Sequence, residues 1–422
     1  MTTLRTGAAG SLALALTLTA CSGGGDGQMH VYMYQDSLAV VQKDAVERFN
    51  EDADVEAVVD EVPGETYEDK VRTVMGSNNQ PDVFFNWGGG NIRPYVEEDM
   101  LLSLDDMMEN NPEFEESFIP SVLEEAQIDG VQYGVPMRGT QPVLLFYNEA
   151  VFEDVGAEPP ETWEDLLGLV DTFNDEGITP FALGGADTWT MQMWLQYLVD
   201  RNGGPEVFQQ IESGDPEGWR DPAMLQAAEG VEELVNRDAF GDNFSSVSFT
   251  EGAASTLLSE GDAAMHLMGS WEYSTHLDQA EEFAENDLGY APFPEVSGGA
   301  GDPANVTGNP TNYFSVTADS EYTEEAQEFL KATAEEEYVR DMVENGEVPT
   351  TTDAEEYLDD SPNPDFARFQ YELVQDAPHF QLSWDQSLDA DVSEAMLNEI
   401  DKLFIGESTP DEFVDAMAEQ QQ

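Results

Sequence analysis

Residues 29–62, MHVYMYQDSLAVVQKDAVERFNEDADVEAVVDEV, decide the fold of this chain. The run at 29–34 favours a strand, and a second extended run follows at 55–62. Between the two runs, apolar residues recur at helical spacing, at Leu38, Val41, Ala45 and Phe49. The order strand, helix, strand predicts a β-α-β unit.

The same alternation continues in the C-terminal direction. A helical stretch places Tyr67, Val71, Val74 and Met75 on one face. A third strand follows at 81–85, bounded by a proline before it and a glycine triplet after it. Alternation of this kind predicts an α/β fold, with a parallel sheet that carries helices on both faces.

A second unit of the same kind begins after residue 136. A strand at 143–147 precedes a helix that Thr162 caps through the Thr162-x-x-Asp165 spacing, and Gly177 ends that helix. Further strands at 178–183 and 263–268 and a helical C-terminal region complete the pattern. Periodicity leaves open whether the two units are independent domains or lobes that exchange segments.

The N-terminus indicates export. A basic start at Arg5 precedes a small and apolar stretch at 7–20, which is too short for a permanent membrane span. The residues Leu18-Thr19-Ala20-Cys21 resemble the bacterial lipobox, in which the cysteine becomes the first mature residue and carries a lipid. The glycine-rich residues 22–27 have the composition of a flexible tether. The alternative is a plain signal peptide. Because Cys21 is the only cysteine, no intramolecular disulfide is possible.

The charge of the chain is extreme and evenly spread. Its 422 residues include 89 Asp and Glu but only 14 Lys and Arg, a formal net charge of −75. Such a charge argues against nucleic acid as a partner. Self-repulsion of this size is relieved at molar salt, where the Debye length falls to roughly 3 Å. We therefore expect adaptation to high salt, and no single acidic residue is diagnostic by itself.

Motifs for chemistry are absent from the sequence. It contains no Walker A loop, no G-x-G-x-x-G turn, no G-x-S-x-G and no H-E-x-x-H. The four histidines show no ligand spacing, and the acidic pairs lack the glycine of a calcium loop. We therefore predict no catalytic residue, no metal and no cofactor. A carboxylate pair of a glycoside hydrolase stays open, because so acidic a chain contains many chance pairs.

Polar and aromatic residues follow the predicted strands where those strands end. The clearest groups are Tyr34-Gln35-Asp36, Asn86-Trp87, Asp187 with Trp189, and Ser270-Trp271. In open α/β sheets, ligands bind at the carboxyl ends of strands. Carboxylates and amides bond to sugar hydroxyls, and flat rings cover the apolar face of a pyranose. These positions therefore suit a sugar.

Five short motifs, in this order, carry a family resemblance. They are Pro81-Asp82-Val83, Tyr133-Gly134-Val135-Pro136 leading to Phe146-Tyr147-Asn148, the stretch 160–166, the stretch 261–271 and the stretch 404–410. Behind the lipobox-like segment, the chain resembles the extracellular solute-binding proteins of ABC importers, in the oligosaccharide-binding group, family 1. The resemblance covers essentially all of the mature chain. It implies a two-lobed periplasmic-binding-protein-like (type II) fold with a hinge and an interlobe ligand cleft.

The resemblance also implies how the chain is divided. Residues 1–20 would be a signal peptide and 21–27 a lipid-anchored flexible tether. The first lobe would contain residues 28–137 plus 270–317. The second lobe would contain residues 138–269 plus 318–422.

The resemblance further implies which residues bind ligand. They are Tyr34, Gln35, Asp36, Asn86, Trp87, Arg138, Asp187, Trp189, Trp271, Tyr313 and Trp384. Asp36 and Asp187 would bond to sugar hydroxyls, while Trp189, Trp271 and Tyr313 would stack on the rings. Glycines beside Trp87 and Trp271 would let the backbone approach the ligand closely.

The expected function is therefore the substrate-binding component of an ABC importer, which captures a neutral sugar, in particular an oligosaccharide. It would work as a monomer on the extracellular face of the cytoplasmic membrane, anchored through lipid on Cys21, and deliver the sugar to membrane permease subunits. An anionic ligand is disfavoured by the negative surface. The alternatives are a secreted carbohydrate-active hydrolase that uses a carboxylate pair, and an anchored surface protein without a small ligand.

Overall fold

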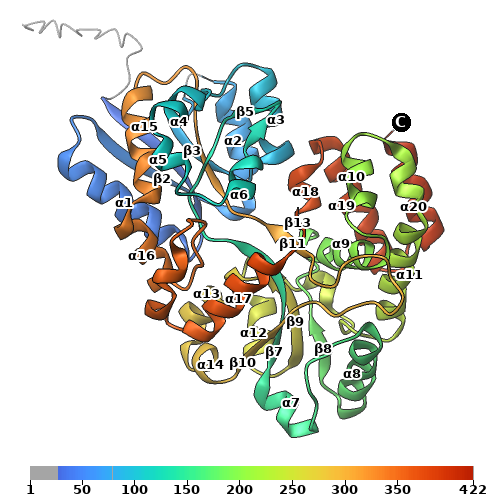
Figure 1. Ribbon diagram of the computed structural model, residues 1–422. Coiled ribbons are helices and arrows are strands. Elements are labelled where there is room, and N and C mark those ends of the chain that lie inside the picture. The colour runs from blue at the N-terminus through green and yellow to red at the C-terminus, as the bar shows by residue number, and fades with distance from the viewer. Residues whose placement is uncertain (1–26, 78, 422) are drawn as a thin grey trace, which may run out of the picture.

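The computed structural model describes residues 27–77 and 79–421. The predicted signal peptide, Cys21 and all but the last residue of the tether lie outside these residues. Two β-sheets, each covered by helices, form two lobes (Figure 1). Each sheet has its own large hydrophobic core, so the α/β two-lobed fold expected from the sequence is confirmed.

The first sheet contains the strands of the opening β-α-β unit. In spatial order its strands are β2 (Glu56–Pro63), β1 (Gln28–Gln35), β3 (Val83–Asn86), β12 (Tyr313–Val316) and β6 (Val135–Pro136). Strand β1 pairs in parallel with β2 and β3, as the alternation predicts. Strand β12 comes from far along the chain and pairs antiparallel with β3 and β6. The sheet is therefore mixed. A separate hairpin joins β4 (Gln127–Ile128) and β5 (Val131–Gln132).

The second sheet is also mixed. In spatial order its strands are β13 (Phe380–Leu382), β11 (Val306–Asn309), β7 (Gln141–Asn148), β9 (Ala263–Gly269) and β8 (Thr179–Ala182), with β10 (Leu288–Ala291) also beside β7. Strand β7 is antiparallel to β9, β10 and β11, so the prediction of parallel pairing is wrong for β7. The reason is that β7 runs into this lobe directly from the first lobe, while β9 runs back toward that junction.

Helices cover both sheets. Those packed around the first sheet are α1 (Ala39–Asp52), α2 (Tyr67–Met75), α3 (Gly89–Glu97), α4 (Asp105–Asn110), α5 (Pro112–Glu115), α6 (Pro120–Glu124), α15 (Thr323–Lys331) and α16 (Glu336–Glu344). Those packed around the second are α7 (Glu149–Val155), α8 (Trp163–Glu176), α9 (Trp189–Gly203), α10 (Glu206–Glu212), α11 (Pro222–Asn236), α12 (Ala253–Ser259), α13 (Trp271–Gln279), α14 (Glu281–Asn286), α17 (Pro364–Asp376), α18 (Trp384–Ser387), α19 (Ala390–Phe404) and α20 (Pro410–Gln420). None of the helices in the described part of the chain combines the length and the apolar character that crossing a bilayer requires.

Local signals fix the ends of α8 as predicted. The Thr162 hydroxyl accepts a hydrogen bond from the backbone N–H of Asp165, and the Asp165 carboxylate accepts one from the Thr162 backbone N–H. This reciprocal pair forms a capping box. Gly177 ends the helix in the left-handed conformation, at φ 77°.

The chain passes between the two cores three times, after β6, between β11 and β12, and between α16 and α17. The predicted lobe boundaries are wrong for two segments. Residues 271–309 belong to the second lobe, because β10 and β11 pair with β7 and Tyr273 lies in the second core. Helices α15 and α16 belong to the first lobe, because Phe329 and Tyr338 lie in its core. Amphipathic spacing predicts a helix but does not say which sheet that helix covers.

Candidate functional site

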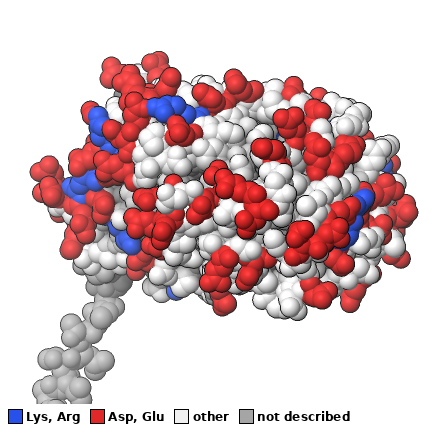
Figure 2. All heavy atoms as spheres, turned by 90° about the horizontal axis from the view of Figure 1, so that it is seen from below, with Lys and Arg blue, Asp and Glu red and all other residues white. Residues whose placement is uncertain are grey.

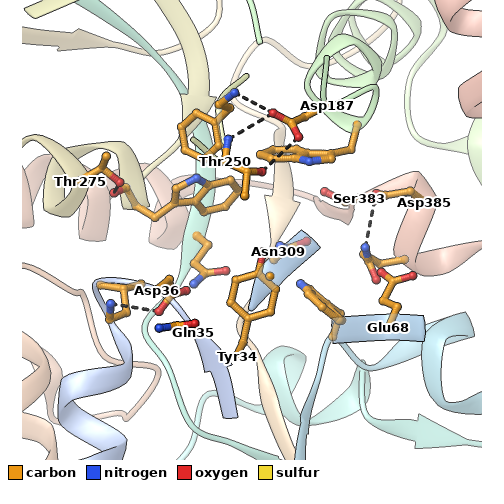
Figure 3. A pocket seen from close by; sticks show the side chains of 18 of the residues that line it. Tyr34, Gln35, Asp36, Glu68, Asp187, Thr250, Thr275, Asn309, Ser383 and Asp385 are labelled. Atoms are coloured by element: carbon orange, nitrogen blue, oxygen red, sulfur yellow. Dashed lines mark hydrogen bonds between the residues drawn. The ribbon is translucent and has the colours of Figure 1, made fainter. Parts of the chain in front are cut away.

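A pocket of about 860 Å³ lies between the two lobes. Its lining includes the end of β1 and the residues that follow it, part of α2, the start of α9, residues along α13, and the segment around α18. In Figure 3, Tyr34, Gln35 and Asp36 of the first lobe lie on one side, and Asp187, Thr250 and Thr275 of the second lie on the other. Seven of the residues expected to bind ligand line this pocket: Tyr34, Gln35, Asp36, Trp87, Asp187, Trp189 and Trp271.

Aromatic rings line the pocket from both lobes. In the first lobe, Tyr34 meets Trp87 edge to face, with ring centroids 5.6 Å apart. In the second lobe, the rings of Trp189 and Trp271 lie 6.2 Å apart and are tilted by 53°. Burial, followed by the charge of Asp36, raises the pKa of Tyr34 to about 12, so its hydroxyl keeps its proton and can donate. The pocket therefore offers apolar ring faces at both sides.

Asp36 is held by a buried cation. Both carboxylate oxygens of Asp36 accept hydrogen bonds from the Arg138 guanidinium, at 2.6 and 2.8 Å. One of these oxygens also accepts from the backbone N–H groups of Leu38 and Ala39 at the start of α1. Arg138 lies between β6 and β7, where the chain leaves the first lobe. The pair thus ties a pocket residue to the junction between the lobes.

Asp187 organises a loop of its own lobe. Its carboxylate accepts hydrogen bonds from the Ser248 and Thr250 hydroxyls and from the backbone N–H groups of Phe249 and Thr250. Figure 3 shows the bonds between Asp187 and Thr250. The loop in turn places Phe249 edge to face against Trp189, with centroids 5.4 Å apart. These four donors occupy much of the accepting capacity of the carboxylate. The predicted bond to a sugar hydroxyl has to share Asp187 with this role.

Four of the expected residues do not line the pocket. Asn86 is buried and bonds to Ser315 and to the backbone N–H of Gly88. The buried guanidinium of Arg138 forms an ion pair with Asp36. The buried Tyr313 hydroxyl donates to the Val122 carbonyl, and the Trp384 ring stacks on Phe208 in the core at 4.6 Å. Tyr313 is therefore not placed to stack on a ligand, because its ring is fully buried beside the first sheet.

Glycines near the tryptophans make room for protein rather than for a ligand. A Cβ on Gly269 would lie 2.1 Å from the Trp271 ring, so this glycine lets the ring lie against β9. A Cβ on Gly90 would lie 2.5 Å from the backbone oxygen of Ser387, in the opposite lobe. The glycine triplet thus allows close contact between the lobes, which differs from the predicted approach to ligand.

The sequence reasoning missed several pocket residues. They include Glu68, Gln141, Gln192, Thr250, Thr275, Asp278, Asn309, Ser383, Asp385 and Gln386. Asn309 ends β11 and Ser383 follows β13, so strand ends could have pointed to these two. Glu68, Gln192 and Asp385 lie on helices, where no sequence signal separates a pocket residue from an exposed one.

Two of the missed residues are carboxylates whose pKa is raised. Burial, followed by the charge of Asp385, raises the pKa of Glu68. Burial also raises the pKa of Asp385, against the effect of hydrogen bonds from Gln192 and Gln386. The Glu68 side chain is solvent-accessible, but it lies inside the pocket, where the surrounding protein removes part of its hydration. In the part of the chain that the structure describes, no three His, Cys, Asp or Glu side chains are arranged so that they could hold a metal ion together.

Two lobes joined by three chain segments around one shared pocket define a binding protein that holds a small ligand between its lobes. The chain matches the family of bacterial extracellular solute-binding proteins over residues 35–340, and it belongs to that family.

Relatives and solved structures agree with this assignment. The chain is 30% identical over 200 residues to a probable sugar-binding periplasmic protein of Brucella melitensis. The aligned stretch covers 47% of this chain and 46% of that protein. It is 27% identical over 229 residues to the xylose/arabinose-binding protein of Haloferax volcanii, covering 53% of this chain and 48% of that protein. The matches thus span about half the length of these relatives.

The fold itself is shared over nearly the whole chain. A solved protein from work on xylan utilization by Caldanaerobius polysaccharolyticus superposes with a TM-score of 0.84 at 23% identity, covering 93% of this chain and 99% of that chain. A chitin oligosaccharide binding protein superposes with a TM-score of 0.82 at 22% identity, covering 93% and 98%. These similarities establish the two-lobed fold.

Proposed function

We propose that this protein captures a neutral sugar, in particular an oligosaccharide, outside the cell and delivers it to the membrane subunits of an ABC importer. Its role is binding without catalysis. The single observation that carries the proposal is the pocket of about 860 Å³ between the lobes, with aromatic rings contributed by each lobe.

The chemistry of the pocket supports a sugar. A pyranose has apolar C–H faces and a rim of hydroxyls, and it therefore needs ring surfaces together with hydrogen-bonding groups. Trp189 and Trp271 supply ring surfaces in the second lobe, and Tyr34 and Trp87 supply them in the first. The volume lies within the range of pockets that enclose a whole small molecule, and it suits a ligand of more than one sugar unit.

The relatives support the same class of ligand. Two of them carry names that describe sugar binding, in Brucella melitensis and Haloferax volcanii. We infer that this chain shares the role of a sugar receptor, with permease subunits as its partners, and that it works as a monomer.

Closure of the lobes would couple binding to delivery. Ligand held by rings from both lobes favours the closed arrangement, and closure changes the surface that a permease can recognise. The three segments that join the lobes would act as the hinge. Arg138 lies on one of them and bonds to Asp36 in the pocket, so this pair would transmit the state of the pocket to the hinge.

We further propose that the mature chain is anchored to the cytoplasmic membrane through lipid on Cys21 and works at high salt. The sequence around Cys21 supports the anchor. The salt adaptation is supported by the surface, on which acidic side chains are spread over the visible face with few basic ones among them (Figure 2). Metabolic labelling with a fatty acid, compared between the wild type and Cys21→Ser, tests the anchor.

An oligosaccharide panel tests the main proposal. Neutral xylo- and gluco-oligosaccharides are incubated with the protein, and thermal denaturation and the appearance of new reducing ends are followed. At a ligand concentration of 100 times Kd, binding should add about 2.7 kcal/mol to the stability of the folded state. A stabilising sugar recovered unchanged supports the proposal. New reducing ends would support the hydrolase instead, and no stabilisation by any sugar would support a surface protein without a small ligand.

A further inference from the structure

All the charged residues found in the lining of the pocket are acidic. Its lining includes six carboxylates, from Asp36, Glu68, Asp69, Asp187, Asp278 and Asp385. No Lys, Arg or His is found among the described residues that line it. The nearby Arg138 is buried and bonds to Asp36 with both arms of its guanidinium. Arg72 lies near Glu68 but is exposed and paired with Asp69.

At one end of the pocket, two of these carboxylates come from opposite lobes. Glu68 lies on α2 of the first lobe, and Asp385 lies on α18 of the second (Figure 3). The Gln386 amide donates to Asp385 at 2.9 Å and also bonds to Glu68, so it lies between the two carboxylates. The Gln192 amide donates to the other oxygen of Asp385. We call these four residues, Glu68, Gln192, Asp385 and Gln386, the acceptor corner.

Hydrogen-bonding capacity in the acceptor corner is unbalanced. An ionised carboxylate only accepts, so both glutamines must turn their N–H groups toward Asp385. Their carbonyl oxygens are then left over, and the Oε1 atoms of Gln192 and Gln386 are buried with no donor in the described protein. Asn309 also lines the pocket, and its buried Oδ1 likewise has no donor in the described protein. The corner therefore lacks donors and has a surplus of acceptors.

We infer that the acceptor corner selects sugars that present hydroxyl or ammonium donors to Glu68 and Asp385 and rejects sugars that carry a carboxylate. The inference rests on the proposed function and names the residues that would set its specificity. A donor-bearing sugar unit would satisfy acceptors from both lobes at once and so favour closure. A uronic acid unit would bring a third negative charge between two carboxylates, where no cation is available to pair with it.

This mechanism differs from repulsion by the negative surface as a whole. Surface repulsion acts over distance and is suppressed at molar salt, where the Debye length is roughly 3 Å. Asp385 is partly buried, and partly buried charges are screened much less than exposed ones. If the acceptor corner is responsible, rejection of acidic sugars persists at molar salt.

Calorimetry with matched sugars tests the inference. The probes are neutral glucose trisaccharides and the same trisaccharides with one C6 hydroxyl oxidised to a carboxylate, at 0.15 M and at about 2 M KCl. The proteins are the wild type, Glu68→Gln, Asp385→Asn and the double variant. A matched control, Asp44→Asn with Glu47→Gln, removes two charges from the exposed face of α1, outside the pocket.

The wild type should bind the oxidised sugar on the order of 100-fold more weakly than the neutral one at both salt concentrations. The double variant should reduce this ratio to about tenfold or less, while the control variant leaves it unchanged. Single variants and melting curves identify any variant that misfolds, and Glu68→Gln alone should already lower the ratio.

Equal binding of both sugars by the wild type would overturn the inference and leave the proposed function intact. A ratio that vanishes at molar salt, or that the double variant leaves unchanged, would also overturn it. So would binding of the oxidised sugar that requires Ca²⁺, because a cation would then occupy the corner. If neither the neutral nor the oxidised sugars bind, and the panel above also yields no ligand, both the proposed function and this inference fail.

Discussion

Replacing Glu347 by glutamine should change how the stability of the protein depends on pH. Glu347 follows α16, on the segment that leads from the first lobe to the second, and its side chain is only 6% exposed. One carboxylate oxygen accepts from the backbone N–H of Gly139, and the other has no donor in the described protein. Burial outweighs the nearby Arg138 and raises the pKa of Glu347 from 4.5 to about 7.

The sign follows from the protons bound in each state. Between pH 4.5 and about 7, the folded protein keeps the Glu347 proton that the unfolded chain has lost. Stability therefore falls as pH rises through this window. At about 1.4 kcal/mol per pH unit, the loss at pH 8 comes to about 3 kcal/mol. Glutamine is neutral throughout, so the variant does not suffer this loss.

Urea denaturation at pH 5, 6, 7 and 8, at constant molar KCl, measures the effect. Because part of the loss has already occurred at pH 5, the free energy of unfolding of Glu347→Gln, minus that of the wild type, should rise by roughly 2 to 3 kcal/mol from the lowest pH to the highest. The control is Glu344→Gln, an exposed residue in the last turn of α16, for which this difference should stay flat. A difference for Glu347→Gln that varies by less than about 0.5 kcal/mol across the range would refute the reasoning, because the carboxyl would then titrate normally.

Three further substitutions test the pocket and the contact between the lobes. Gly269→Ala places a Cβ 2.1 Å from the Trp271 ring, so the ring must move, and calorimetry should show sugar affinity reduced by about tenfold. Gly90→Ala places a Cβ 2.5 Å from a backbone oxygen of α18, so the lobes can no longer meet there and sugar binding should weaken. Small-angle scattering in saturating sugar should show a larger radius of gyration for this variant than for the wild type. Gly76→Ala, which has open space at its Cβ, should leave both measurements unchanged. Asp187→Asn weakens the bonds that hold the loop at 248–250, so this loop should become susceptible to limited proteolysis while the melting temperature falls by only a few degrees.

Local sequence signals predicted the elements well because each signal acts over a few residues. The capping box at Thr162 and Asp165 and the strand at 263–268 are decided by neighbours in the chain. Segment exchange between the lobes is decided by contacts hundreds of residues apart. The pairing of β12 with β3 joins Tyr313 to Asn86, and no periodicity in either segment signals it.

The candidate site could be predicted where it follows strand ends and not elsewhere. Tyr34 lies at the end of β1 and Asp187 comes a few residues after β8, and both line the pocket. Tyr313 and Trp384 are residue types that also suit a sugar site, but their rings fill the cores. An aromatic residue gives the same sequence signal in both settings, because burial in a core and stacking on a ligand favour the same chemistry.

Because the chain contains so many acidic residues, its sequence does not show which carboxylates matter for binding. The arrangement of the two lobes distinguishes them. In a chain with 89 Asp and Glu, the sequence gives no signal that sets one carboxylate apart from the others. Glu68, Asp385 and Glu347 differ because each lies in the pocket or at the junction between the lobes, where the protein removes water, and the pKa of each is raised. Like charges held close together across two moving bodies oppose the approach of those bodies unless a donor comes between them. Under the proposed function, a ligand rich in hydroxyls supplies such donors, and these carboxylates would therefore make closure of the lobes depend on the ligand.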